Sequence, residues 1–310
     1  MNPLGDRFQR LTDQVELFHP LGNHRFALCH RSHCAPRALL HEYSCFYEAN
    51  ELDDAHGRNS GVPDFKVRVF AAAGKLSHNW GVKFLGGELG SWIAIPSVYQ
   101  QLSVAGSSYS KDDLSNIDVV PFTAFNHKGI VHWYYELQVQ TLGTGYVTGA
   151  PLNIGQHNVA FAPAAAFTLT PHRGAQNIMS RFDYVINNPD HVTHYHSGNE
   201  FFWQFGAQQE LPRSRASVGL SGYFYQQVTN DSQSGVAVVT QNSDGTFSTG
   251  YKGRVLDLGP QVTFPWGRYG ALVVKWDHDM LVQNRARGNG FWFQFGVPFG
   301  YFHHPQPEAH

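Results

Sequence analysis

The fold is decided by residues 290–299, which read GFWFQFGVPF. Side chains of a β-strand point alternately to its two faces, so every second residue of this stretch lies on one face. In water such an apolar face would be an edge-strand and aggregation hazard, whereas against lipid it is favourable. The residues that would form it are Phe291, Phe293, Phe295, Val297 and Phe299.

The same period of two recurs along the chain. In VHWYYELQV, residues 131–139, apolar and polar side chains alternate, and about a dozen segments of this kind are separated by Gly, Asn, Asp, Ser or Pro. Their lengths suit the ~9–11 residues of a tilted transmembrane strand, while a soluble sandwich remains the alternative. We therefore predict an all-β fold, an antiparallel transmembrane β-barrel of about twelve strands of the outer-membrane type.

The composition excludes several functional classes. Charged residues make up 15 % of the chain, below the ~25 % usual for soluble domains, and the net charge of −2 gives no basic surface for nucleic acid. No run of 18 apolar residues is long enough for a transmembrane helix. The three cysteines, Cys29, Cys34 and Cys45, form neither a disulfide framework nor a zinc motif.

An ordered set of short stretches resembles a known family across roughly residues 41–299. The stretches are NELDD (50–54), VPDFKVRV (62–69), SNIDVVPF (115–122), IGQHNVAFAPAAAFT (154–168), FDYVINN (182–188), THYHSGNEF (193–201), GLSGYFYQQVTND (219–231), GRVLDLGPQV (253–262) and FWFQFGVPF (291–299). Together they resemble the outer-membrane proteins that are encoded with aromatic-degradation pathways, the phenol-degradation meta-pathway proteins.

The resemblance implies a transporter of the bacterial outer membrane that admits small hydrophobic or aromatic compounds, with no catalytic residues and no cofactor or metal. The partners it implies are membrane lipid, the substrate and the barrel-assembly machinery, and not nucleic acid. The closing strand, residues 291–299, is similar to the carboxy-terminal signal by which that machinery recognises barrels. The family signal normally ends the chain, but here residues 300–310 follow it.

Three segments are expected along the chain. Residues 1–40 lack the basic start, apolar core and cleavage site of a secretory signal, and CHRSHCAPRALL (29–40) has no period. We interpret this atypical amino-terminal segment as a possible mis-assigned start or local frameshift. Residues 41–299 form the barrel domain, and residues 300–310 form a carboxy-terminal tail.

Polar residues on the strands are expected to face the lumen, because the apolar faces are turned to lipid. Opposite charges among them should pair across a partly occluded lumen, because an isolated charge is poorly solvated there. The predicted lumen-lining residues are Lys66, Arg68, Glu136, Arg181, Asp183, Glu200, Tyr223, Tyr225, Lys275 and Asp277.

The alternative function is a soluble, cupin-like, metal-dependent enzyme. His194, His196 and Glu200 match the first part of the cupin motif, and two histidines with a carboxylate suit divalent iron. The second part, P-x-G-x-x-H, would fall on residues 298–303, past the closing strand and about 100 residues away. With 18 histidines in the chain, an H-x-H pair is expected by chance, so we favour the barrel.

Overall fold

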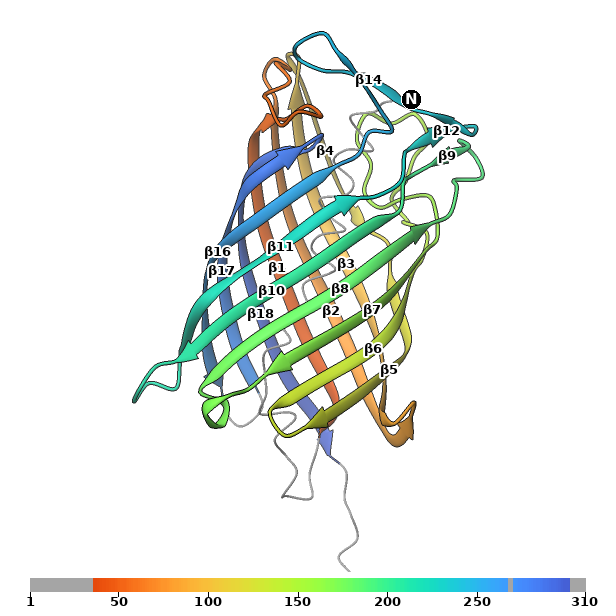
Figure 1. The fold of residues 1–310 in the computed structure, drawn as a ribbon. Coiled ribbons are helices and arrows are strands. Elements are labelled where there is room, and N and C mark those ends of the chain that lie inside the picture. The colour runs from red at the N-terminus through yellow and green to blue at the C-terminus, as the bar shows by residue number, and fades with distance from the viewer. Residues whose placement is uncertain (1–35, 267–269, 302–310) are drawn as a thin grey trace, which may run out of the picture.

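Twelve antiparallel strands close into a barrel in the computed structural model, which describes residues 36–266 and 270–301 (Figure 1). The ladder between the first and last strands, β1 and β18, completes the ring. The prediction of about twelve strands is thus confirmed. The strands are β1 (Pro36–Leu52), β2 (Lys66–Phe84), β3 (Gly87–Val104), β5 (Asp118–Lys128), β6 (Val131–Gln140), β7 (Ala160–Leu169), β8 (Gln176–Asn187), β10 (Glu200–Glu210), β11 (Ser217–Gln227), β16 (Arg254–Trp266), β17 (Gly270–Gln283) and β18 (Ala286–Tyr301).

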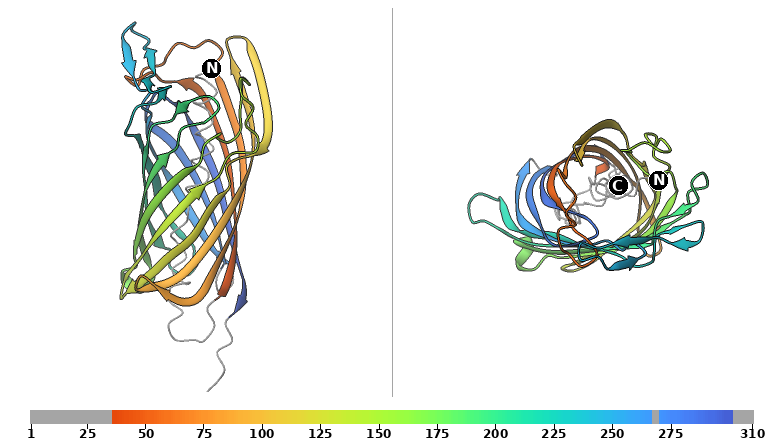
Figure 2. Two further views of the ribbon diagram at one scale, coloured as in Figure 1. Left: turned by 90° about the vertical axis from the view of Figure 1, so that its right-hand side faces the viewer. Right: turned by 90° about the horizontal axis from the view of Figure 1, so that it is seen from above.

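The connections differ in length at the two ends of the barrel (Figure 2). One end carries short turns such as residues 85–86 and 129–130, and the one-turn 3₁₀-helix His172–Gly174. The other end carries the long segments 53–65, 141–159, 188–199 and 228–253. In outer-membrane barrels long loops are extracellular and short turns periplasmic, which orients the molecule. No helix among the described residues is long and apolar enough to cross a membrane.

Short strands outside the ring of twelve lie at the extracellular end of the barrel. β4 (Ser107–Leu114) pairs with the upper half of β3, and β5 then pairs with the lower half of β3. The others are β9 (Tyr195–His196), β12 (Ser232–Gln233), β13 (Val236–Ala237), β14 (Val239–Gln241) and β15 (Phe247–Thr249).

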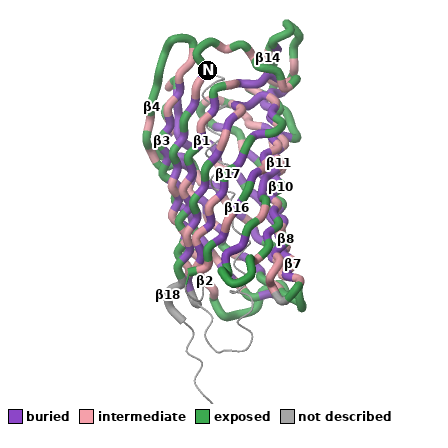
Figure 3. Tube along the Cα trace, turned by 90° about the vertical axis from the view of Figure 1, so that its left-hand side faces the viewer, coloured by how far each residue is buried: buried purple, intermediate pink, exposed green. Residues whose placement is uncertain are grey.

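Buried and exposed residues alternate along each wall strand (Figure 3). The exposed set encircles the barrel as an apolar belt, which is the surface expected against lipid rather than water. The chain is therefore a transmembrane barrel of the outer-membrane type. The belt includes Leu40, Phe46, Phe70, Leu76, Ile93, Ile95, Tyr135, Phe161, Ile178, Phe182, Tyr184, Ile186, Trp203, Val218, Leu220, Phe264, Trp276, Phe291, Phe293 and Val297.

The first strand begins earlier than the sequence indicated. β1 starts at Pro36 and pairs with β18 from that residue onward, so residues 36–40 belong to the barrel wall. Apolar and polar side chains alternate only weakly in residues 36–40, so the sequence pattern did not predict a strand there. The hydrogen-bonded ladder to β18 places these residues in the sheet. The last strand, β18, likewise runs to Tyr301, so residues 300–301 belong to the wall and not to the predicted tail. The other predictions for residues 1–35 and 302–310 lie outside the described residues.

Candidate functional site

The inner wall of the barrel is the candidate site, and its most ordered part surrounds Arg181 on β8. This side chain is 1 % exposed, and its guanidinium donates through Nη1 to Glu136 Oε1 at 2.7 Å and to the Tyr134 hydroxyl at 2.8 Å. Its Nε lies 2.9 and 3.0 Å from the two oxygens of Asp183. Paired hydrogen bonds of this kind place carboxylate oxygens opposite the N–H groups of a buried guanidinium and also supply the opposite charge.

Glu136 extends this Arg181 cluster to two further strands. Its Oε2 accepts hydrogen bonds from Trp92 Nε1 on β3 and Thr123 Oγ1 on β5, each at 2.9 Å. On β2, the Lys75 ammonium lies 3.3 Å from the centre of the Trp92 ring, a cation–π contact. Side chains of β2, β3, β5, β6 and β8 are therefore linked inside one sector of the lumen.

Strand β7 makes this cluster possible because its inward side chains are small. In the ladder, Ala164 lies between Glu136 and Asp183, and Ala166 lies between Tyr134 and Arg181. A larger side chain at either alanine would occupy the space through which Arg181 reaches across β7. The alternation AFAPAAAFTL over residues 160–169 thus sets lipid-facing Phe161 and Phe167 against a row of inward alanines.

A glycine has the same effect on β11. Gly219 lies between Gln208 of β10 and Gln261 of β16 in the two ladders. Because no side chain intervenes, Gln261 Nε2 donates to Gln208 Oε1 at 3.3 Å across the intervening strand. The hydroxyl of Thr263 donates to the same oxygen at 2.9 Å.

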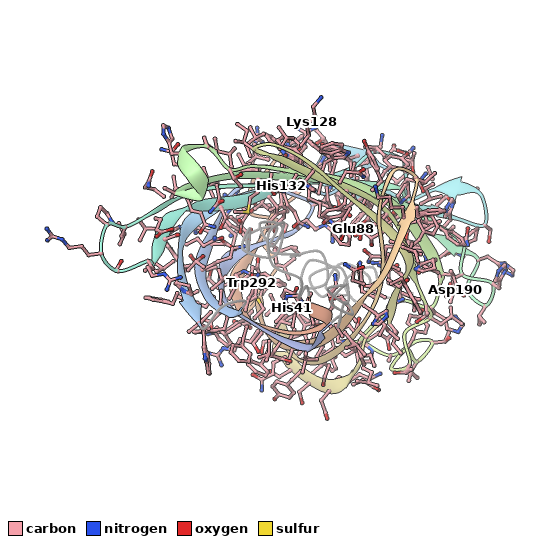
Figure 4. All side chains as sticks on the ribbon, turned by 90° about the horizontal axis from the view of Figure 1, so that it is seen from below. His41, Glu88, Lys128, His132, Asp190 and Trp292 are labelled. Atoms are coloured by element: carbon pink, nitrogen blue, oxygen red, sulfur yellow. The ribbon has the colours of Figure 1, made fainter. Side chains whose placement is uncertain are left out.

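A second charged group lines the wall formed by β1, β16, β17 and β18. Lys275 Nζ lies 3.4 Å from Asp277 Oδ2 and 5.6 Å from the centre of the Trp292 ring. The Tyr47 hydroxyl donates to Asp279 Oδ2 at 2.7 Å, and the Gly288 amide donates to the same oxygen at 2.8 Å. Figure 4, a view from the periplasmic end, shows Trp292 pointing into the barrel while Lys128 projects outward.

The extracellular half of the lumen is lined by an apolar layer, which borders the second charged group at Tyr47 and Trp292. It is one continuous cluster of buried residues from ten wall strands and from the loops 53–65 and 141–159. Phe202 and Tyr225 pack at 4.8 Å within it. Its members include Leu52, Phe65, Val67, Val69, Leu102, Leu152, Ile154, Val185, Phe202, Tyr225, Val255 and Val282.

The extracellular loops are joined by buried carboxylates. Asp54 Oδ2 accepts from the Ser243 hydroxyl at 2.7 Å and from its amide at 3.0 Å, and Oδ1 accepts from the amides of His56 and Arg58. Burial alone would raise the pKa of Asp54, but these hydrogen bonds outweigh it and lower the pKa to about 2. Loop 53–65 is thereby fixed to loop 228–253.

Two more carboxylates extend this arrangement. Asp231 accepts from the Tyr195 hydroxyl at 2.6 Å and from the Gly198 amide at 2.7 Å, which joins loop 228–253 to loop 188–199. Asp190 Oδ1 lies 3.2 Å from His157 Nδ1, which joins loop 188–199 to loop 141–159. Burial would raise the pKa of Asp190, but backbone hydrogen bonds within its own loop lower it overall.

Eight of the ten predicted lumen-lining residues are buried on the inner side of the wall. Five of them fall in the two charged groups described above. Glu200 is buried at the extracellular end of β10, and the two tyrosines lie on the inner face of β11. That these side chains border a transport path stays a prediction. The eight are Glu136, Arg181, Asp183, Glu200, Tyr223, Tyr225, Lys275 and Asp277.

The assignment of Lys66 and Arg68 to the lumen is wrong. Their side chains are 40 % and 47 % exposed on the outer face of β2, where both pair with Glu48 of β1. Their neighbours Val67 and Val69 are buried inside. At the extracellular end of β2 the outer surface meets water, while the inward side chains Val67 and Val69 are apolar, so the polarity of this strand is there the reverse of that in the belt.

The structure does not assemble the metal site that the cupin alternative would require. His194 lies in a turn with φ +55°, and His196 Nε2 is 2.8 Å from the carbonyl oxygen of Asn187, while Glu200 begins the next wall strand. Within the described residues, no three or more His, Cys, Asp or Glu side chains are grouped so that they could hold a metal ion. A closed barrel with an apolar outer belt also rules out the soluble cupin fold.

Sequence reasoning missed Tyr134, Trp92 and Lys75, which complete the Arg181 cluster. Tyr134 lies on the polar face of its strand, two residues before Glu136, and the alternation alone does not distinguish it from its polar neighbours. Trp92 and Lys75 lie in segments where Ser, Ala and Gly blur the alternation. For the closing strand, Phe291, Phe293 and Val297 are exposed and Phe295 is half-buried on the outer face; the side chain of Phe299 lies outside the described residues.

Comparison with known proteins agrees with this architecture. A family model described as "Putative MetA-pathway of phenol degradation" matches residues 49–295. The fold is similar to that of the COG4313 outer membrane channel from Pseudomonas putida F1, with a TM-score of 0.70 at 10 % identity, over 85 % of this chain and 96 % of that one. It is also similar to the transport unit of the autotransporter AIDA-I from Escherichia coli, with a TM-score of 0.50 at 10 % identity, over 97 % and 99 %. No curated protein is significantly similar in sequence.

Proposed function

The chain belongs to the family described by the phenol-degradation model, and we propose that it is an outer-membrane channel for small hydrophobic or aromatic compounds. The observation that carries this proposal is the apolar layer in the extracellular half of the lumen. A neutral aromatic solute gains from contact with such a lining, whereas an ion or a strongly hydrated solute must shed water to pass it. The similar barrel from Pseudomonas putida is itself described as an outer membrane channel.

In this role the chain is a passive channel and catalyses no reaction. Arg181 is paired inside the wall with Glu136 of β6 and with Asp183 of its own strand, and such ion pairs hold a wall together. Pairs of this kind also narrow the lumen, because they project inward from several strands. We therefore propose slow passage of apolar solutes rather than an open aqueous pore.

Uptake of a hydrophobic fluorescent aromatic probe by intact cells tests the proposal. N-phenyl-1-naphthylamine is excluded by an intact outer membrane, so cells that produce the channel should take it up faster than cells that do not. Phe202→Gln places an amide in the apolar layer and should slow this uptake. Phe201→Gln alters the neighbouring, outward-facing residue of β10 and should leave uptake unchanged.

Two outcomes would contradict the proposal. Cells with and without the channel could take up the probe at equal rates, or the two Phe variants could behave alike. General leakiness is monitored by susceptibility to vancomycin, a large hydrophilic antibiotic that should be excluded equally from all strains.

We further propose that the barrel-assembly machinery recognises β18. Its outer face carries exposed Phe291, Phe293 and Val297, and the sequence pattern extends this row to Phe299. Phe299→Ala should lower the fraction of folded barrel in the outer membrane, measured by gel migration without boiling. Phe264→Ala, which removes an exposed belt residue from β16, should assemble normally; equal defects in both variants would argue against a signal in β18.

A further inference from the structure

On the inner wall, one row of the ladders alternates polar side chains with glycines. Ser221 of β11 lies between Gly206 of β10 and Gly259 of β16. Asp277 of β17 pairs with Gly290 of β18, and a Cβ added to Gly259 would lie 2.9 Å from the Asp277 Cα. Because glycine has no side chain, neither Ser221 nor Asp277 has a side chain beside it on the adjacent strands of this row.

Polar atoms along this row have no hydrogen-bond partner in the part of the chain that the structure describes. Ser221 is 5 % exposed, and its hydroxyl makes no hydrogen bond. The same holds for both carboxylate oxygens of Asp277, which is 1 % exposed, and for Oδ1 of Asp257, which is 4 % exposed and lies two residues before Gly259 on β16. Buried polar groups are nearly always hydrogen-bonded, so a hydroxyl and two carboxylates left in this state indicate a missing donor. We call Ser221, Asp257 and Asp277 the β11–β17 site.

The β11–β17 site carries an excess of negative charge. Lys275 Nζ lies 3.4 Å from Asp277 Oδ2, and among the described residues this is the one ion pair that either carboxylate makes. Two carboxylates therefore share one ammonium group. The neighbouring carboxylate of Asp279 adds to the negative charge around Asp257, although its own Oδ2 is hydrogen-bonded. A positively charged ligand is favoured at such a site and an anion is repelled.

An aromatic ring lies beside the carboxylates. A Cβ added to Gly290 would lie 2.9 Å from Nε1 of Trp292, so the indole covers Gly290, the ladder partner of Asp277. Trp292 points into the barrel and belongs to the apolar layer, so the β11–β17 site lies at the border of that layer (Figure 4). Indole rings attract cations to their faces and also pack against other aromatic rings.

We propose that the β11–β17 site binds primary aromatic amines as ammonium ions, with the ring of the amine against Trp292 and the apolar layer. The inference rests on the proposed channel function and names a class of solute for it. An ammonium group has three N–H donors, which suit the Ser221 hydroxyl and the carboxylates of Asp257 and Asp277. Its charge also compensates the carboxylate that Lys275 leaves unpaired.

Other ligands match the site less well. A hydrocarbon has no donor, and a neutral alcohol has one donor and no charge, so both leave buried acceptors without a partner. For a metal ion, the described residues contain no group of three or more His, Cys, Asp or Glu side chains that could hold it. An amine exchanges protons with water, so it can cross the apolar layer in its neutral form, which a metal ion cannot do.

Calorimetric titration of the refolded full-length chain in detergent micelles at neutral pH tests the proposal. The probes are 2-phenylethylammonium and 2-phenylethanol, which have the same ring and differ in the charged group. The amine should bind at least about tenfold more tightly than the alcohol, because hydrogen bonds between charged groups are stronger than those between neutral ones. Asp277→Asn should abolish most of this difference, and Ser221→Ala should weaken amine binding by about two- to tenfold.

Glu48→Gln is the matched control, since it removes a carboxylate from the outer face of β1 and should leave amine binding unchanged. Equal affinities for the amine and the alcohol, or equal effects of Asp277→Asn and Glu48→Gln, would overturn the proposal. The gel shift on boiling verifies folding, and Ser221→Ala tests the site even if Asp277→Asn does not fold.

The probe uptake described above separates this inference from the channel function. A chain that speeds the uptake of N-phenyl-1-naphthylamine but does not prefer the amine would refute the β11–β17 site alone. Preferential amine binding by a chain that does not speed this uptake would refute the channel function alone.

Discussion

Arg181 carries a permanent charge inside the barrel wall, so the surrounding residues must replace the water it has lost. Glu136 and Asp183 supply opposite charge, and Tyr134 supplies a further acceptor. Removing one partner of such a group is much more unfavourable than the group's net contribution suggests, because the remaining charges stay buried. Substitutions in this cluster are therefore expected to lower the stability of the barrel more than substitutions elsewhere in the wall.

Arg181→Met should accordingly lower the free energy of unfolding by about 3–5 kcal/mol, because it leaves two carboxylates buried without their cation. Urea titration in lipid vesicles, followed by tryptophan fluorescence, measures this. Arg68→Gln is the control, since it removes an exposed pair with Glu48 that is worth about 0–1 kcal/mol. Equal effects of the two substitutions would show that the buried cluster is not a special stabilising element.

The hydrogen bonds of Asp54 predict how the stability of the extracellular loops depends on pH. In the folded protein the pKa of Asp54 is about 2, below that of a free aspartate. The hydrogen bonds to loop 228–253 therefore stabilise the folded loops fully at pH values above the pKa of a free aspartate. This stabilisation should fade as the pH falls from about 4 towards 2, as the carboxylate becomes protonated. The link between the two loops should therefore persist at mild acidity and be lost only near pH 2.

The Ser243 amide donates to Asp54, so its NMR chemical shift in detergent micelles should titrate with a midpoint near pH 2. Asp54→Asn should abolish that titration. A midpoint near 4 in the unmodified protein would mean that the carboxylate is not held by these hydrogen bonds in solution.

At the scale of the strand, β7 shows how small residues permit long contacts. Ala164→Leu should block the route between Glu136 and Asp183 and lower the free energy of unfolding by about 1–3 kcal/mol. Ala165→Leu adds the same side chain to the opposite, lipid-facing side and should change stability by less than about 0.5 kcal/mol. The same urea titration compares them, and a larger effect at residue 165 would reverse our assignment of the two faces.

Period-two alternation was sufficient to predict the strands, their number and the lipid-facing side of β10, where Trp203 is exposed while Glu200, Gln204 and Gln208 are buried. The rule that polar means inward failed on β2, because Lys66 and Arg68 stand beyond the belt, where the outside is aqueous. Contacts such as Asp54 with Ser243, 189 residues apart, leave no local pattern and depend on how the loops fold over the barrel.

For the whole molecule, we expect the order of layers along the lumen to decide what the proposed channel admits. Solutes from outside would first meet the apolar layer and then the ion pairs of the lower wall. An apolar constriction resists ions because water leaves it readily, even where its diameter would admit them. A barrel of this size is thus expected to conduct ions poorly while it admits apolar solutes.

In planar bilayers the unmodified protein should show only small single-channel conductance. Val67 is fully buried in the apolar layer, so a substitution there tests whether this layer causes the low conductance. Val67→Asp should hydrate the layer and raise the conductance. Arg68→Gln, one residue along on the outer face, should leave it unchanged. A large, stable conductance in the unmodified channel would contradict the occluded lumen. An unchanged conductance in Val67→Asp would mean that the barrier to ions lies lower, among the cross-strand pairs around Arg181.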